Sequence, residues 1–230
     1  MNIFKYIYIY NLWGFGSGSG SLSQNNKQYI DFLNQFIHSH IDIHRIIDLG
    51  CGDWQLHRHI DFKENKYLGI DIVKEVIDNN RTHYSTDKIQ FKCVNFLDVD
   101  FILPRGDLLI VKDVLQHLSN SNIRIFLDKL QMNSYKYILI TNDVSTINLN
   151  YLNIKDGMYK PLNIRKSPYN MKGNMVLRYY DKLYLIVYCI ILFFFMYRIG
   201  QHPSWLNGIL LLGFIFYGYF ILPIKEVYLI

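Results

Sequence analysis

The chain has 230 residues, half of them apolar, which is enough for one domain of ordinary size with a hydrophobic core. Its formal net charge is +5, and outside residues 155–182 we find no basic face with interleaved aromatic side chains, so the composition argues against nucleic-acid binding. Three widely separated cysteines, Cys51, Cys93 and Cys189, argue against a disulfide framework and indicate a reducing compartment.

The N-terminal stretch contains a Gly/Ser-rich loop. The residues before it hold an aromatic run that is too short and too polar for a signal peptide. Residues 13–23, WGFGSGSGSLS, are typical of flexible linkers and also of loops whose backbone approaches a ligand. We therefore expect an arm over residues 1–23. From Ser23, apolar residues recur at helical spacing and predict an amphipathic helix that ends near His40.

Segments with strand and helix patterns then alternate. Short apolar runs predict five strands, at Arg45 to Leu49, Tyr67 to Asp71, Ile89 to Val94, Asp107 to Val111 and Tyr137 to Thr141. Helical patterns lie between some of them, over Trp54 to Phe62, Val73 to Tyr84 and Asn120 to Gln131. This alternation predicts an α/β fold with a parallel sheet covered by helices on both faces.

The pattern changes after Asp143. Residues 155–182 carry seven Lys or Arg and two Asp. Within and after them, Met175 to Tyr180 and Leu183 to Tyr188 flank Asp181-Lys182 and predict an antiparallel hairpin at the sheet edge. The globular domain would therefore cover residues 24–188.

The remaining residues, 189–230, are expected to form a hydrophobic helical tail. Apolar runs cover Leu183 to Tyr197 and Trp205 to Ile224, and the second reaches the roughly 17 to 20 residues that a membrane span needs. Basic residues before the first run and Lys225 after the second favour a tail that enters a membrane from its cytoplasmic face. The alternative is a tail folded against the domain or a partner subunit of a cytoplasmic protein.

The segment IIDLGCGDWQ, residues 46–55, ends a predicted strand in a glycine turn. Gly50 and Gly52 allow the backbone to approach a ligand, and Asp71 ends the next strand, where a carboxylate accepts hydrogen bonds from both hydroxyls of a ribose. A nicotinamide fingerprint would need a third glycine at Gln55. Asp48 would repel a pyrophosphate, but it would attract a ligand with an ammonium group and a sulfonium.

These residues resemble the class I S-adenosylmethionine-dependent methyltransferases. DLGCG at 48–52 looks like their first motif, GID at 69–71 like the acidic end of their second strand, and DLLIVKDVLQHL at 107–118 like their fourth strand and following turn. WGFGSGSGS, DLGCGDWQ, KDVLQHL and LITND also resemble a small, little-characterised branch of these enzymes. The resemblance covers roughly residues 13–143 and implies a Rossmann-like, doubly wound sheet that ends in an antiparallel hairpin.

Two positions depart from the family pattern. Trp54 replaces the third glycine of the first motif, which a following helix tolerates if it points this position away from the ligand. Asn95 stands where an acid usually follows the third strand, with Phe96 beside it, and Asp98 is the alternative if the loop is longer. Asp53 is expected to cap the helix that begins at Trp54.

The resemblance implies S-adenosyl-L-methionine as the cofactor and a role for each motif. The methionine part would be held by Asp48 and the turn of Gly50, Cys51 and Gly52, the ribose by Asp71 with Ile72 beside it, and the adenine by Asn95, Phe96 or Asp98. Lys112 is expected beside the cofactor, and the loop of residues 17–21 over its amino acid end.

The acceptor is expected at the carboxyl ends of the fourth and fifth strands, where Gln116 and Asn142 also lie. Methyl transfer needs a general base only for a poorly nucleophilic acceptor, and the candidates, in order, are Asp113, His117 and Asp143. If these side chains have only a structural role, Lys112 pairs with Asp113 or Asp143, and His117 forms a hydrogen bond with an unpaired backbone group of a helix. The basic segment up to Lys182 would cover this side and hints at an anionic acceptor or a lipid surface.

No metal site is predicted. The histidines at positions 38, 40, 44, 57 and 59 repeat no known ligand spacing and are expected at the surface. The sequence thus predicts methyl transfer to an unidentified small molecule, lipid or protein, with no nucleic-acid partner. Two alternatives stay open, a catalytically inactive nucleoside-binding membrane protein and a nicotinamide-dependent oxidoreductase.

Overall fold

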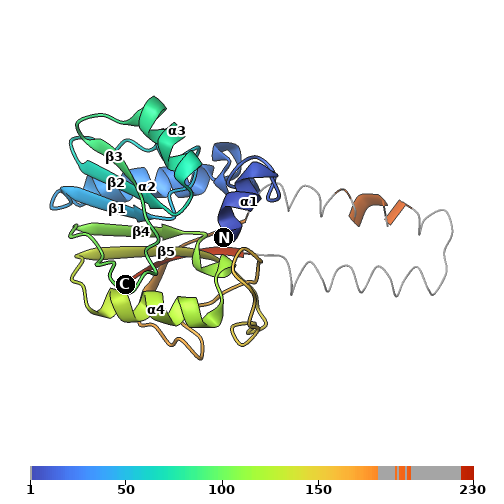
Figure 1. The fold of residues 1–230 in the computed structure, drawn as a ribbon. Helices are drawn as coiled ribbons and strands as arrows, with labels where there is room; N and C mark the ends of the chain where they lie inside the picture. The colour runs from blue at the N-terminus through green and yellow to red at the C-terminus, as the bar shows by residue number, and fades with distance from the viewer. Residues whose placement is uncertain (1, 181–189, 191, 195, 198–223) are drawn as a thin grey trace.

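The computed structural model describes residues 2–180, 190, 192–194, 196–197 and 224–230. They form a seven-stranded sheet in the order β3-β2-β1-β4-β5-β7-β6 (Figure 1). The first five strands in the chain are parallel: β1 (Arg45–Leu49), β2 (Lys66–Asp71), β3 (Ile89–Cys93), β4 (Leu108–Lys112) and β5 (Tyr137–Val144). The five strands predicted from short apolar runs are confirmed, with ends shifted by up to three residues.

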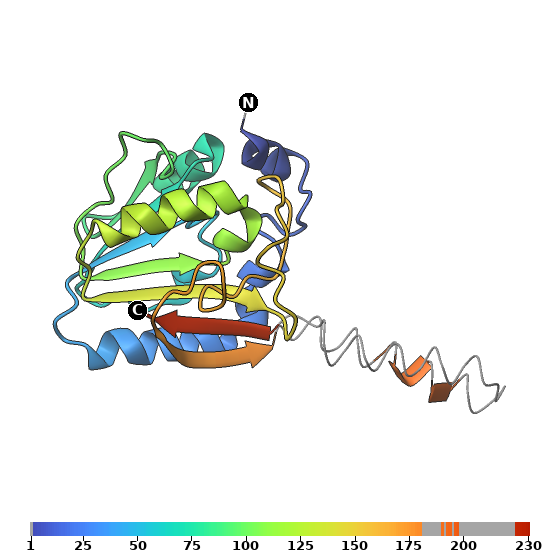
Figure 2. The same cartoon turned by 90° about the horizontal axis from the view of Figure 1, so that it is seen from below.

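Helices cover both faces of the sheet (Figures 1 and 2). The described helices are α1 (Ile3–Ile9), α2 (Lys27–Ser39), α3 (Lys74–Tyr84) and α4 (Asn120–Gln131). Side chains alternate between the faces of β1, so that Ile46 packs in one core with α2 and α3, whereas Ile47 packs in a second core with α4. The mainly parallel, doubly wound fold expected from the alternating pattern is confirmed.

The predicted helix from Trp54 to Phe62 is wrong. Trp54 has a φ of +58°, which no α-helix contains, and the segment holds only a single 3-10 turn at His57–His59. Buried aromatic contacts explain the loop, because the Trp54 ring packs against Phe62, Tyr67, Tyr84 and Phe91. Tertiary packing has therefore overridden the local helical pattern.

The antiparallel edge differs from the expected hairpin in its second strand. Strand β6 (Asn174–Tyr180) is present, but its partner is β7 (Ile224–Leu229), which also pairs with β5. Leu183 to Tyr188 lies outside the described residues. Residues 224–230 thus belong to the sheet rather than to the predicted tail, because Val227 and Tyr228 are buried between neighbouring strands.

The rest of the predicted tail lies almost entirely outside the described residues. Within the ranges that the structure describes, no helix is long and apolar enough to cross a membrane.

Candidate functional site

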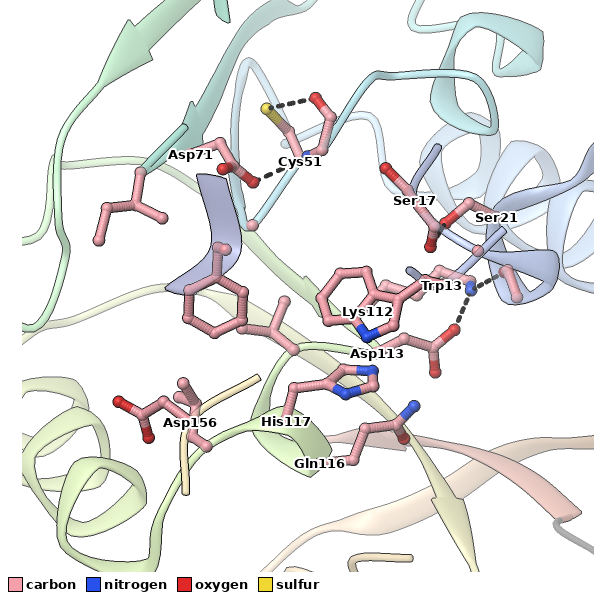
Figure 3. Close-up of a pocket in the computed structure, with 18 of the residues that line it drawn as sticks. Trp13, Ser17, Ser21, Cys51, Asp71, Lys112, Asp113, Gln116, His117 and Asp156 are labelled. Atoms are coloured by element: carbon pink, nitrogen blue, oxygen red, sulfur yellow. Dashed lines mark hydrogen bonds and ion pairs between the residues drawn. The ribbon is translucent and has the colours of Figure 1, made fainter. Parts of the chain in front are cut away.

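A cavity of about 720 Å³ opens at the carboxyl ends of the parallel strands (Figure 3). Its volume falls in the range of sites for small organic ligands. It is lined by the N-terminal arm, by the carboxyl ends of the parallel strands and the loops that follow them, by Asn122 of α4 and by Lys225 of β7. Such loops are where α/β sheets of this kind bind ligands.

The backbone amides of the glycine turn after β1 anchor this turn to the end of β2. Gly50 and Gly52 have φ values of +74° and +55°, a left-handed region that side chains disfavour. The Gly50 and Cys51 amides donate to the Ile70 carbonyl at 2.7 and 3.1 Å, and the Gly52 amide donates to Asp71 Oδ2 at 3.1 Å. These three N–H groups therefore fix the shape of the turn. What the turn can offer to an ammonium group is its backbone carbonyl oxygens, which accept hydrogen bonds.

Asp71 faces the cavity from the end of β2. Its Oδ2 accepts from the Gly52 amide, and its Oδ1 accepts from the Val73 amide at 3.0 Å. Burial raises the pKa of this carboxyl, against the opposing effect of these amide donors. Ile72 lines the cavity beside it, as expected.

Asn95 and Phe96 line the cavity after β3, and Asp98 does not. Asn95 Nδ2 donates to Asp98 Oδ1 at 2.6 Å, and Asn95 Oδ1 accepts from the Leu97 amide at 3.1 Å. Asp98 therefore orients the Asn95 amide from behind. Of the two alternatives left open by the sequence, the geometry favours Asn95 with Phe96.

Asp48 lies away from the cavity, contrary to the expectation that it holds a ligand directly. Its carboxylate accepts hydrogen bonds from His57 Nδ1 at 2.6 Å and from the Tyr67 hydroxyl, and it is almost completely buried. The reason is the alternation along β1, which turns Asp48 to the same face as Ile46. His57, expected at the surface, is buried as its partner.

Four charged side chains form a buried network beside the cavity. Asp113 Oδ2 lies 2.5 Å from Lys112 Nζ and 2.9 Å from Lys225 Nζ, and Lys225 Nζ lies 2.9 Å from Asp143 Oδ1. Burial alone would raise the pKa of Asp113, but the two lysines prevail and lower it to about 2. Burial lowers the pKa of Lys112, whereas Asp113 and Asp143 raise that of Lys225 despite its burial.

His117 is set up differently from the two carboxylates. Burial lowers its pKa, its Nδ1 donates to the Met158 carbonyl at 3.0 Å, and its ring lies 4.6 Å from that of Trp13 (Figure 3). A carbonyl only accepts, so Nδ1 carries the proton and Nε2 keeps its lone pair. Among the three predicted base candidates, His117 is thus the one that is not ion-paired.

The other polar residues singled out from the sequence, Gln116, Asn142 and Asp53, contact neighbouring parts of the protein or lie outside the cavity. Gln116 Oε1 accepts from the Asp143 amide at 2.7 Å, and Gln116 Nε2 donates to Asp143 Oδ2 at 3.3 Å. Asn142 does not line the cavity, because the neighbours Asn142 and Asp143 point to opposite faces of β5. Asp53 caps no helix: it accepts from the Ser17 amide and hydroxyl at 3.2 and 2.8 Å and so ties the arm to the glycine turn.

Several lining residues were missed by the sequence reasoning: Tyr8, Trp13, Asp156, Tyr159 and Lys225. The Gly/Ser-rich loop of residues 13–23 was a signal for Trp13, which is its first residue. Lys225 gave none, because it follows a long apolar run and reads as a flanking charge. Two cations of the basic segment have partners within the protein: Lys160 Nζ donates to the Leu152 carbonyl at 2.8 Å, and Arg178 forms an ion pair with Glu226.

Within the described part of the chain, no group of three or more His, Cys, Asp or Glu side chains is arranged to hold a metal ion.

Comparison with known proteins adds the chemistry. Residues 47–131 match a family model described as a methyltransferase domain. No curated protein sequence matches the chain significantly. A crystal structure from Galdieria sulphuraria, described as a sarcosine dimethylglycine methyltransferase, is 15% identical, with 99% of this chain and 98% of that chain covered and a TM-score of 0.56.

Two further solved structures are similar to the chain. The cyclase SpnF is 14% identical, with 86% of this chain and 79% of that chain covered and a TM-score of 0.51. Human N-acetylserotonin methyltransferase, solved with its cofactor, is 20% identical, with 58% of this chain covered and a TM-score of 0.42. The chain spans 46% of that enzyme's length. The likeness to the Galdieria sulphuraria structure and to SpnF, at 15% and 14% identity, shows the fold alone.

Proposed function

Because the chain carries a class I S-adenosylmethionine-dependent methyltransferase domain, we propose that it methylates an acceptor held beside His117. The cofactor is S-adenosyl-L-methionine. The single observation that carries the proposal is the convergence of the glycine turn, Asp71, Asn95 and His117 on one cavity.

The residues present fit this cofactor group by group. Asp71 offers a buried carboxylate to the hydroxyls of a ribose, and Phe96 and Asn95 offer an aromatic ring and an amide to a purine. The turn at Gly50 and Gly52 lets backbone oxygens approach an ammonium group without a Cβ between them. Asp48 supports this turn indirectly, through His57 and Tyr67 behind β1.

The chemistry then depends on orientation and on one proton. When bound, the cofactor supplies a methyl group on a positively charged sulfur, which is already activated for in-line displacement. The protein's part is to hold the acceptor atom in line and to exclude water. His117 Nε2 accepts a proton from an acceptor that is poorly nucleophilic while protonated, and the Met158 carbonyl keeps that nitrogen turned to the cavity.

Asp113 and Asp143 act as positioning residues in this scheme. Each is paired with a lysine, so neither offers a free carboxylate as a base at neutral pH. Lys112 also donates to the Gly20 carbonyl at 2.9 Å, which fastens the N-terminal arm over the site. The order of base candidates therefore changes to His117 first.

Membrane association, on the cytoplasmic face, also remains our proposal. It is supported by the two apolar runs, Leu183 to Tyr197 and Trp205 to Ile224, of which Ile224 belongs to the sheet, and by the basic residues that precede the first run. Membranes washed with alkaline carbonate should retain the full chain. Its release would favour the alternative, a segment folded against the domain or a partner subunit.

The cofactor binding that the proposed activity requires is tested by calorimetric titration of the full chain in detergent with S-adenosylmethionine, S-adenosylhomocysteine and NADH. Methyl transfer itself is tested by screening acceptors with S-adenosylmethionine labelled in the methyl group. We expect both adenosyl ligands to bind and Asp71→Ala to weaken them by roughly 10- to 100-fold, the loss expected for hydrogen bonds to a charged group. Asp87→Ala removes an exposed carboxylate far from the cavity and is the control. Binding of NADH in preference to the adenosyl ligands would refute the proposal.

A further inference from the structure

Exposed apolar side chains gather on two segments of the chain that also contribute residues to the cavity. One group lies on the N-terminal arm and the other on the segment that follows β5, up to the end of β6. We call them together the apolar rim: Ile3, Ile9, Tyr10, Leu12, Phe15, Ile147, Tyr151, Leu152, Met158, Tyr159 and Tyr180. Single exposed apolar residues are common on soluble proteins, but so many of them on two segments that line a cavity indicate an interaction surface.

The two halves of the rim touch each other. A Cβ on Gly157 would lie 3.0 Å from side-chain carbons of both Ile3 and Ile7, so helix α1 packs directly on the loop after β5. Both halves also reach into the cavity, since Ile3 and Tyr159 line it and are each 43% exposed. The two segments that carry the rim therefore also form part of the wall of the site.

Residues 181–223, which hold the apolar runs, begin and end at neighbouring points of the sheet. Tyr180, the last residue of β6, pairs with Ile224, the first of β7, and Ile224 also pairs with Val144 at the carboxyl end of β5. Figures 1 and 2 show this junction at the same end of the strands as α1. Residues 181–223, with their two apolar runs, are thus attached one residue from Lys225 of the site.

We infer that the apolar rim rests on a lipid bilayer, with the mouth of the cavity facing the membrane. The rim combines aliphatic side chains with four tyrosines, and tyrosine is favoured at the boundary between lipid and water. The second apolar run of the attached segment, which begins at Trp205, reaches the length that a membrane span needs, whereas the first run of 15 residues is marginal. One consequence rests on the proposed function: a methyl acceptor would reach His117 along the membrane surface.

Exposed apolar residues at the opposite end of the strands supply matched controls. Ile102 and Met132 lie in loops that precede β4 and β5, and they are 81% and 85% exposed. They are apolar and accessible like the rim residues, but they lie at the amino ends of the strands. A bilayer that touches the rim cannot touch them at the same time.

The experiment uses the full chain in phosphatidylcholine vesicles, with a polarity-sensitive fluorophore on one introduced cysteine. Rim positions are Leu12→Cys and Leu152→Cys, and control positions are Ile102→Cys and Met132→Cys, in a background with Cys93→Ser and Cys189→Ser. We expect a blue shift and quenching by nitroxide-labelled lipid at the two rim positions and neither effect at the controls.

Three other results would overturn the inference. Rim fluorophores as solvent-exposed as the controls would mean that this edge touches nothing. A blue shift without quenching by the lipid nitroxide would mean that residues 181–223 cover the rim, and the same result with a dependence on protein concentration would mean that a second copy does. Calorimetry with S-adenosylmethionine on the same samples reports separately on the proposed function.

Discussion

His117 is held as a neutral imidazole by contacts from two distant parts of the chain. Trp13 of the arm lies against its ring, and the Met158 carbonyl accepts from Nδ1. Burial, the largest effect on its pKa, lowers that pKa from the ordinary 6.5. Its neutral form thus favours folding at pH above 6.5, and this contribution is lost as the pH falls through the depressed value.

We therefore predict that His117 titrates below pH 6.5 with the proton on Nδ1, and that Trp13→Ala moves its pKa toward 6.5 by admitting water. Nitrogen-15 NMR of labelled histidine, followed as a function of pH, measures both quantities. His117→Gln assigns the resonance. A wild-type pKa at or above 6.5, or a proton on Nε2, would remove the basis for a role as a proton acceptor.

Gly52 serves the arm as well as the cofactor turn. A Cβ there would lie 2.4 Å from Ser17 Oγ and 2.9 Å from the Tyr8 hydroxyl. We predict that Gly52→Ala displaces the arm and weakens S-adenosylmethionine binding by roughly tenfold or more. Separately, backbone strain at a positive φ should lower the free energy of unfolding by approximately 1 to 2 kcal/mol. Calorimetry gives the affinity, and limited proteolysis within residues 10–23 reports on the arm.

Gly14→Ala is the matched control for this prediction. Gly14 has a similar φ of +69°, but no atom lies within 4 Å of a Cβ built on it. It should show the strain without the loss of affinity. Equal effects of the two substitutions would mean that strain, rather than contact with the arm, explains the requirement for glycine.

At the scale of the elements, β7 contributes a cation to the site. Lys225 is almost fully buried between the carboxylates of Asp113 and Asp143, at 2.9 Å from each. Lys225→Met would leave two buried carboxylates with one lysine, and we predict a loss of about 3 to 5 kcal/mol in the free energy of unfolding. Denaturant titration measures it. Lys27→Met, at an exposed pair with Asp31, should be close to wild type.

The contrast between β4 and β7 explains what the sequence could predict. The apolar run of β4 and the helical spacing of α4 are local patterns, and the motifs at Gly50 and Asp71 are local as well. Strand β7, IKEVYL, follows a long apolar run and carries two charges whose partners, Asp113 and Arg178, lie far away in sequence. Its pairing, like the burial of Asp48 beside His57, depends on tertiary contacts that no local pattern encodes.

At the scale of the whole molecule, the sheet does not need residues 181–223 for its connectivity. Tyr180 and Ile224 are directly paired, so a two-residue Asn-Gly turn can join them. We predict that this shortened protein is soluble without detergent and binds S-adenosylmethionine like the full chain. Thermal unfolding and calorimetry test both points, and a chain that fails to fold would mean that the removed residues form part of the core.

The place of Lys225 in the chain has a consequence for protein synthesis. Strand β7 leaves the ribosome only after residues 181–223 have been made, and until then Asp113 and Asp143 lack their shared cation. The nascent chain can close its first five strands, but the charged network beside the cavity stays incomplete. Any sorting of the apolar segment by the cell's insertion machinery therefore begins before the enzyme can acquire its finished site.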